Sequence, residues 1–137
     1  VVDVKNLPSL QADIVVDAVI GYSLNQAPRN ETKDMIRWAH DQRSEHAAHV
    51  VSLDIPSGID ATTGDAPGTY IVADTTLTLA LPKVGTHPDT VVPPESVGDL
   101  RLGDLGIPSG VYARFGSPFP FQSSYVVGLQ PMDTVTD

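Results

Sequence analysis

The sequence has 137 residues, of which 41% are hydrophobic, and it carries a formal net charge of −9 with a pI near 4.6. It contains no cysteine and no apolar run near the roughly twenty residues that cross a bilayer, which excludes disulfides, thiolate metal sites and a transmembrane helix. The length, the hydrophobic fraction and the lack of an apolar run predict a soluble globular protein without a membrane partner, and the absence of cysteine suits a cytoplasmic location. The eight Lys and Arg residues form no basic stripe, so nucleic acid is not an expected partner.

The first half of the chain predicts a buried strand followed by an amphipathic helix. Residues 12–20 read ADIVVDAVI, a nearly continuous apolar run that is typical of a strand buried on both faces of a parallel sheet. From about Asn30 to Glu45 the spacing becomes helical, with Asn30 as the predicted N-cap. Trp38 is interpreted as a packing residue of this helix. The predicted inward stripe consists of Met35, Ile36 and Ala39.

Three further strands are predicted in the second half of the chain, at residues 49–55, 73–81 and 98–105. The last of them is expected near an edge because it alternates and carries Arg101. A strand, a helix and a strand of these lengths make a βαβ unit. The predicted fold class is therefore α/β, a Rossmann-like three-layer α/β/α sandwich with a mostly parallel sheet. Because the chain begins at Val1 rather than Met, we expect this sheet to be incomplete at its N-terminus.

The composition of the chain changes near residue 108. Residues 1–108 carry the predicted strands and helix, whereas residues 109–137 are rich in Gly, Pro and Ser and lose hydrophobic periodicity. We therefore expect part of one α/β domain over residues 1–108, followed by an irregular arm or linker over residues 109–137.

The first candidate site lies where the first strand ends. Asp17 emerges from the apolar run, and a short loop then leads into the predicted helix. A small-residue turn that opens a helix presents backbone N–H groups and a positive helix end to an anion such as a phosphate. The same pattern is an ordinary tight connection between a strand and a helix, and both interpretations stay open. The loop consists of Gly21, Tyr22, Ser23, Leu24, Asn25, Gln26 and Ala27.

The second candidate site follows the strand at residues 49–55. Asp54 lies at the end of this strand, and Pro56 and Gly58 fix a sharp turn around Ser57. A carboxylate there can exchange a proton with a ligand hydroxyl, or it can simply cap the turn through an Asx-type hydrogen bond. A serine hydrolase is disfavoured because the G-x-S-x-G elbow is absent around Ser57.

The third candidate site follows the strand at residues 73–81. Lys83 lies at the same expected edge of the sheet, where it can meet a phosphate, pair with a carboxylate or remain a solvated surface lysine. His87 lies in the same loop without a partner at the spacing of metal ligands, which favours an exposed histidine.

Four segments together resemble, in order and spacing, the YjeF N-terminal family of NAD(P)H-hydrate epimerases. The similarity covers roughly Ala12 to Pro108, so residues 1–108 resemble the C-terminal portion of that domain. Its most specific part is the run from Asp54 to Asp60, followed by Thr-Gly. The four segments read VVDAVIGYSL, VVSLDIPSGIDATTG, ADTTLTLALPKVG and VGDLRLGDLGIP.

The resemblance implies an isomerase that interconverts the R and S forms of hydrated NADH or NADPH in metabolite repair. It implies that Asp54 is the catalytic, substrate-contacting carboxylate and that residues 21–27 lie against the dinucleotide. It also implies that Asp17 and Ser57 are ligands of a potassium ion, for which hard oxygen donors are suitable. A homodimer, and a fused or separate NAD(P)H-hydrate dehydratase as a partner, follow from the same resemblance.

Two departures from the family pattern limit these expectations. The Asn-Asn-Gly-Gly-Asp loop of the family occurs nowhere in this sequence, so the chain alone is expected to be inactive. Gln26 and Ala27 stand where family members often have glycine and a polar residue. The competing function is a non-catalytic binding or dimerisation scaffold. The presence of Asp17, Asp54 and Ser57 together favours the enzyme, because a scaffold has no chemical need for them.

Overall fold

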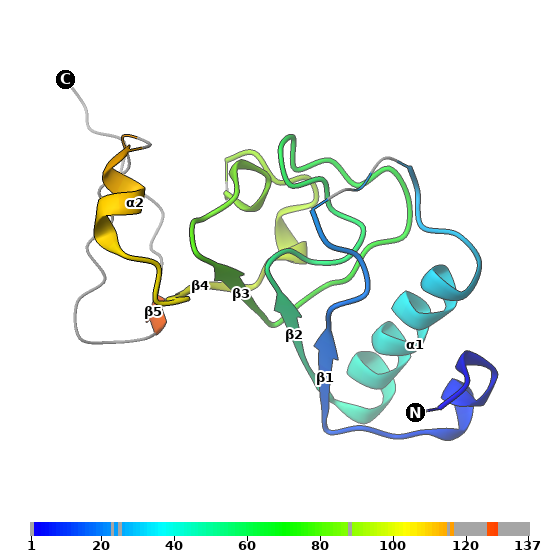
Figure 1. The fold of residues 1–137 in the computed structure, drawn as a ribbon. Coiled ribbons are helices and arrows are strands. Elements are labelled where there is room, and N and C mark those ends of the chain that lie inside the picture. Colours follow the sequence, from blue (N-terminus) through cyan, green and yellow to red (C-terminus); the bar gives the residue numbers. More distant parts are fainter. Residues whose placement is uncertain are drawn as a thin grey trace.

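The computed structural model describes residues 2–22, 24, 26–87, 89–114, 116 and 126–128. Within these residues the chain forms one sheet of five strands in the order β1-β2-β3-β4-β5 (Figure 1). The first four strands are parallel, and β5 is antiparallel to β4. Their bounds are β1 (Ile14–Asp17), β2 (His49–Leu53), β3 (Thr75–Leu79), β4 (Asp99–Gly103) and β5 (Val126–Gly128).

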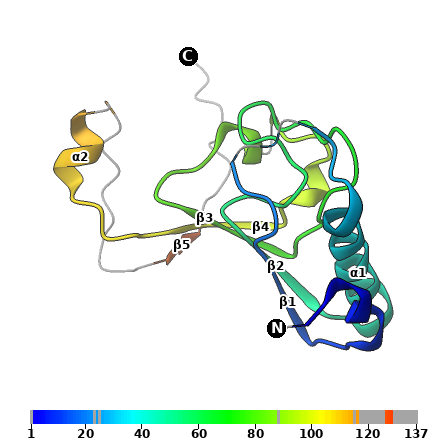
Figure 2. The same ribbon diagram turned by 45° about the vertical axis from the view of Figure 1, so that its right-hand side comes forward.

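One long helix, α1 (Asn30–His46), connects β1 to β2, and a short helix, α2 (Ser109–Arg114), follows β4. Both views place α1 at the β1 end of the sheet and α2 beyond β4 (Figures 1 and 2). These elements confirm the predicted α/β class and the mostly parallel sheet. In the described part of the chain, no helix has the length and apolar character that a membrane span needs. Three 3₁₀ helices complete the structure, namely η1 (Val4–Ser9), η2 (Val84–Thr86) and η3 (Pro94–Ser96).

The helix α1 matches the predicted span, but its start differs from the prediction. Its N-cap is Arg29, which has extended backbone and no side-chain capping hydrogen bond. Asn30 is the first helical residue and has a φ of 49°, a conformation that asparagine tolerates better than most residues. The prediction of Asn30 as N-cap was therefore wrong by one residue. Near the other end, Gln42 is buried and its Oε1 accepts a hydrogen bond from the backbone N–H of Ala12, 3.0 Å away.

One face of the sheet is covered by α1. Val15 of β1 and Val50 of β2 are register partners on this face, and both are buried. Ile36 and Ala39 of α1 pack against them, as the predicted inward stripe requires. A second cluster, which includes Ile55, holds the loops at the carboxyl ends of the strands. The core of this domain is therefore built on one side of the sheet and above its carboxyl edge.

The opposite face of β1 is largely exposed. Ile14 is 64% exposed and Val16 is 59% exposed, although both belong to the apolar run. The prediction of a strand buried on both faces was therefore wrong for this face. Side chains alternate along a strand, so α1 covers Val15 but cannot reach its two neighbours, and no other described residue takes the place of a second layer.

An ion pair joins α1 to the start of β3 at the amino edge of the sheet. Both Nε and Nη2 of Arg43 donate to Oδ1 of Asp74, at 3.0 and 2.8 Å, and the backbone N–H of Val50 donates to its Oδ2 at 2.8 Å. Burial alone would raise the pKa of Asp74, but the Arg43 and Val50 hydrogen bonds and the Arg43 charge outweigh it and hold the pKa below its ordinary value.

Candidate active site

The predicted site residues gather at the carboxyl edge of the sheet. Because β1, β2 and β3 are parallel, the residues that follow them meet at one edge (Figure 1). Asp17 is the last residue of β1, Asp54 follows β2 directly, and Lys83 lies four residues beyond β3. The three candidate sites are thus neighbours in space, as the α/β prediction required.

Asp17 and Ser57, the two predicted potassium ligands, contact each other directly. Asp17 is 2% exposed, and its Oδ1 lies 2.5 Å from Oγ of Ser57. Its Oδ2 accepts hydrogen bonds from the Ser57 backbone N–H and from Oγ of Ser52, each at 2.8 Å. Oγ of Ser57 also accepts a hydrogen bond from the backbone N–H of Ile20 at 2.9 Å. This network fixes the turn after β2 against the end of β1.

The chemistry of this donor set suits an alkali cation. The carboxyl group of Asp17 is buried and forms no ion pair with any described residue. The neighbouring oxygens are Oγ of Ser57 and, 3.5 Å from it, the carbonyl oxygen of Ile20. Carboxylate, hydroxyl and carbonyl oxygens are hard ligands of the kind such cations take.

Asp54 is held in an unusual backbone conformation. Its φ is 72°, in the left-handed region that costs a non-glycine residue free energy. Its backbone N–H donates to the carbonyl of Leu77 at 2.9 Å, and its Oδ1 accepts from the backbone N–H of Leu79 at 3.0 Å. These two hydrogen bonds hold the Asp54 carboxylate against the carboxyl end of β3. The alternative role predicted for Asp54, an Asx-type cap of its own turn, is not what its described contacts show.

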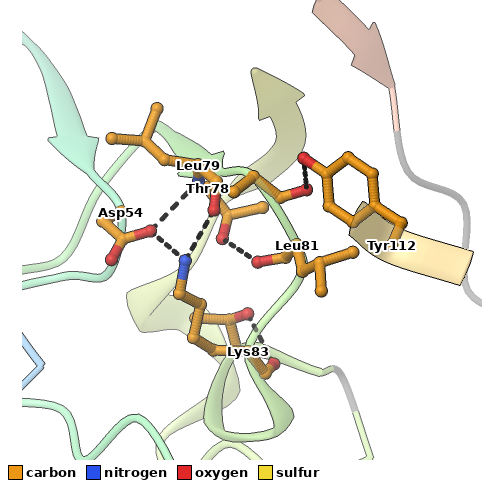
Figure 3. Close-up of polar contacts among 8 residues, drawn as sticks. Asp54, Thr78, Leu79, Leu81, Lys83 and Tyr112 are labelled. Atoms are coloured by element: carbon orange, nitrogen blue, oxygen red, sulfur yellow. Dashed lines mark hydrogen bonds and ion pairs between the residues drawn. The ribbon is translucent and has the colours of Figure 1, made fainter. Parts of the chain in front are cut away.

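Lys83 completes this arrangement, as Figure 3 shows. Its ammonium forms an ion pair with Oδ1 of Asp54 and donates to the carbonyl of Leu79 at 2.8 Å. The side chains of Lys83 and Asp54 are only 16% and 27% exposed. Of the three roles left open by the sequence, the pairing with a carboxylate is the one that the structure shows. A lysine and a carboxylate thus form a half-buried ion pair.

A pocket of about 350 Å³ lies beside Lys83. Lys83 lines one side of it together with residues that follow β3, and Tyr22 from the loop after β1 lines it as well. Tyr22 is 65% exposed, so its ring is accessible to a ligand. Tyr22 of the loop after β1 and Lys83, the ion-pair partner of Asp54, therefore line a common cavity.

The described part of the predicted dinucleotide loop comprises Gly21, Tyr22, Leu24, Gln26 and Ala27. Ser23 and Asn25 lie outside the described residues. The loop precedes the N-terminus of α1, the arrangement expected of an anion-binding turn. A Cβ added to Gly21 would meet no atom within 4 Å, so nothing in the described chain itself requires glycine there.

At two glycines, the backbones of neighbouring loops approach each other closely. Gly58 has a φ of 98°, and a Cβ on it would collide with the carbonyl oxygen of Thr69. A Cβ on Gly85 would collide with the carbonyl oxygen of Asp60. The backbone N–H groups of Thr63 and Thr62 donate to the carboxylate of Asp60, which lowers its pKa. The loop that follows β2 is therefore closely packed against its neighbours.

His87 takes no part in a metal site among the described residues. Its Nδ1 accepts a hydrogen bond from the backbone N–H of Asp89 at 3.2 Å, and the ring is partly exposed. In the part of the chain that the structure describes, no three His, Cys, Asp or Glu side chains gather as a transition-metal site would require.

Sequence reasoning missed two residues that shape this region. Ser52 is fully buried inside β2 and hydrogen bonds to Asp17, its register partner on β1. A serine inside an apolar strand was a usable signal, because a buried hydroxyl needs a partner. Tyr112 of α2 is 4% exposed, and its hydroxyl donates to the carbonyl of Ala80 at 3.3 Å (Figure 3). That contact lies 32 positions away in the sequence and has no local signature.

The fold and the site together define an α/β domain with a lysine–carboxylate ion pair, whose lysine lines a pocket, at the carboxyl edge of a parallel sheet. A family model described as "YjeF-related protein N-terminus" matches residues 2–85, more than half of the chain. The chain belongs to this family.

Curated relatives share substantial sequence identity with the chain. It is 47% identical over 122 residues to the NAD(P)H-hydrate epimerase of Dehalogenimonas lykanthroporepellens, covering 87% of this chain and 46% of that protein. It is 36% identical to the NAD(P)H-hydrate epimerase of Truepera radiovictrix, covering 84% of this chain and 49% of that protein. The bifunctional NAD(P)H-hydrate repair enzyme Nnr of Escherichia coli is 39% identical over 71% of this chain and 18% of its own length.

A solved structure shares the fold. The crystal structure of yeast ynu0, YNL200c, matches 92% of this chain and 50% of its own chain with a TM-score of 0.68 and 21% sequence identity. The chain thus spans about half the length of the two epimerases and of the yeast protein.

Proposed function

We propose that this chain is part of an NAD(P)H-hydrate epimerase, which interconverts the R and S forms of hydrated NADH and NADPH. The observation that carries the proposal is the Asp54–Lys83 ion pair, whose lysine lines a pocket together with Tyr22 of the loop after β1. The names of the relatives support the same activity, and the presence of Asp17 and Ser57 beside the pair supports a functional rather than a scaffold role.

The chemistry of epimerisation suits such a pair. The hydrate carries a hydroxyl on a carbon bonded to the ring nitrogen. A proton given to that hydroxyl lets it leave as water, while the nitrogen lone pair stabilises the cation that remains. Water then adds to the opposite face and returns one proton, so there is no net oxidation or proton change. We assign this proton exchange to Asp54, which would give the proton as the carboxylic acid and, once it is a carboxylate, take back the proton that the adding water releases, while the Lys83 ammonium compensates the carboxylate charge.

The dinucleotide itself is assigned to residues 21–27. Backbone N–H groups of this loop and the N-terminus of α1 would hold the pyrophosphate of an otherwise acidic protein. Asp17 and Ser57 would hold a potassium ion, which supplies positive charge near the phosphates. We further propose a cytoplasmic homodimer that acts beside a fused or separate NAD(P)H-hydrate dehydratase.

The test replaces Asp54 in a chimaera in which this chain substitutes for the matching segment of the Dehalogenimonas epimerase. Asp54→Asn keeps the shape but removes the proton site, so epimerisation should slow by about a hundredfold to ten-thousandfold with little change in substrate affinity. Chromatographic resolution of the two epimers measures the rate. Asp65→Asn, which changes an exposed aspartate in the following loop, is the control and should leave the rate unchanged. A chimaera with Asp54→Asn as fast as its parent would refute the proposed role, whereas the unfused 137-residue chain should show no activity.

A further inference from the structure

The turn that follows β3 carries the lysine of the Asp54–Lys83 pair. Residues 79–83, which we call the β3 turn, all line the pocket that Lys83 shares with Tyr22. Ala80 in this turn has a φ of 64°, a left-handed conformation that is unfavourable for a residue with a Cβ. Such a conformation persists only where surrounding groups fix it, so the contacts of Ala80 decide how the β3 turn is held.

Contacts within the β3 turn connect the backbone at Ala80 to the position of Lys83. The Lys83 ammonium donates to the carbonyl of Leu79, 2.8 Å away (Figure 3). The backbone N–H of Leu81 donates to the same carbonyl at 2.7 Å. This carbonyl belongs to the peptide unit that ends at the nitrogen of Ala80. A rotation at Ala80 would therefore move the acceptor of Lys83, and with it the ammonium that pairs with Asp54.

Two residues from later in the chain hold Ala80 from outside the β3 turn. Its backbone N–H donates to the carbonyl of Gly103, the last residue of β4, at 3.2 Å. Its carbonyl accepts from the hydroxyl of Tyr112 in α2 at 3.3 Å (Figure 3). Tyr112 is buried although it belongs to a short helix near the end of the described chain. Both polar backbone groups of the left-handed residue are thus bound by elements that follow β3.

We infer that Tyr112 is a positioning residue for the reaction, because its hydroxyl holds the left-handed backbone of Ala80 and thereby keeps the Lys83 ammonium on Asp54. The kinetic part of this inference rests on the proposed function, whereas the structural part does not. Tyr112 does not line the pocket, so it acts through Lys83. It also lies beyond residues 2–85, which the family model matches.

Trace acetylation of the 137-residue chain with acetic anhydride tests the structural part. The chain has three lysines, so mass spectrometry of its peptides quantifies each one, with Lys5 and Lys33 as internal references. An ammonium held in an ion pair reacts when the pair opens. Tyr112→Phe removes only the hydroxyl and should speed acetylation of Lys83 by about two- to tenfold, the factor that one neutral hydrogen bond contributes to a local opening equilibrium. Lys5 and Lys33 should react as in the parent chain.

Tyr70→Phe is the matched control. It also removes one tyrosine hydroxyl with its hydrogen bond, here to Oε1 of Glu95 at 3.4 Å, and Tyr70 does not line the pocket. It should leave the rate at Lys83 unchanged. Tyr112→Met is a second variant without the hydroxyl if Tyr112→Phe fails to fold, and circular dichroism checks all three. The inference is overturned if Lys83 reacts at the parent rate in the Tyr112 variants, or if Tyr70→Phe speeds it equally.

A double-mutant cycle in the chimaera tests the kinetic part. Tyr112→Phe should weaken affinity for the hydrated dinucleotide by about two- to tenfold and change turnover less, because Lys83 acts through its charge. In a Lys83→Met background the same change should cause no further loss, since the group that Tyr112 positions is gone. An equal loss in both backgrounds overturns the inference. A chimaera without epimerase activity sinks the proposed function instead, and the acetylation rates then decide the role of Tyr112.

Discussion

The Arg43–Asp74 pair allows a quantitative test because the chain contains a matched counterpart. Arg101 donates through Nε and Nη2 to Oδ2 of Asp99, at 2.8 and 2.5 Å, in the same two-nitrogen geometry. The two pairs differ in surroundings. The Asp74 side chain is 24% exposed and also accepts from the Val50 backbone N–H, whereas the Asp99 side chain is 51% exposed and its pair spans only two positions.

The expected cost of Asp74→Ala follows from these contacts. Leaving the Val50 N–H without its acceptor costs about 1–3 kcal/mol, and the lost Arg43 bonds add a smaller contribution because they are partly screened by solvent. We therefore expect Asp74→Ala to lower the free energy of unfolding by about 2–3 kcal/mol. Asp99→Ala removes an exposed pair and should lower it by about 0–1 kcal/mol. In urea the first variant should shift the midpoint by roughly 1 M and the second by much less.

The contribution of Asp74 to the free energy of unfolding should depend on pH in a defined direction. The pKa of Asp74 is lowered in the folded chain, so its ionised form adds stability above its ordinary value of 3.8, and this stability is lost as the pH falls through the lower folded-state pKa. The difference between the parent chain and Asp74→Ala should therefore be full at pH 7 and shrink below about pH 4. Equal urea midpoints for Asp74→Ala and Asp99→Ala at pH 7 would refute this expectation. A stability difference between the parent chain and Asp74→Ala that grows on acidification would refute it as well.

Three further predictions concern ligand binding in the chimaera. Lys83→Met should weaken affinity for the hydrated dinucleotide more than it lowers turnover, as separate measurements of Kd and kcat would show, and equal losses in both would contradict an electrostatic role. Gly21→Val should weaken dinucleotide binding at least about tenfold in calorimetry although the chain has room for the side chain, so unchanged affinity would remove the phosphates from this loop. Replacing tetramethylammonium by potassium should raise the melting temperature, and Asp17→Asn should abolish the increase; identical melting curves in both salts would count against the cation.

The sequence predicted the strands and the helix well because their signals are local. The apolar runs located β1, β2 and β3, and the helical spacing located α1 to within one residue at its end. The strand lengths were overestimated, since the residues flanking each run leave the ladder to form turns. Asp54 illustrates this, because its left-handed backbone ends β2 before the predicted boundary.

The candidate site was predicted in part, because the order of the strands can be read from the sequence whereas the conformation of the loops cannot. That Asp17, Asp54 and Lys83 would meet followed from the parallel order of the strands, and the resemblance to a family paired Asp17 with Ser57. The partner of Lys83 could not be predicted, because the distance between its ammonium and the Asp54 carboxylate depends on the conformation of the turn after β3 and not on the spacing of residues in the sequence. The exposure of Ile14 could not be predicted at all, since an apolar run does not reveal whether a second layer is present.

The near-contacts of Gly58 and Gly85 have a consequence for how this pocket can change. Any side chain at either position would push one loop away from the other, so substitutions at Gly58 or Gly85 should lower the stability of the fold. The opposite wall is permissive, because Tyr22 is exposed and Gly21 has open space around it. New ligand preferences should therefore arise by substitution in the loop after β1. A library randomised at Tyr22 should yield more folded variants than one randomised at Gly85, so engineering for other ligands would begin at Tyr22.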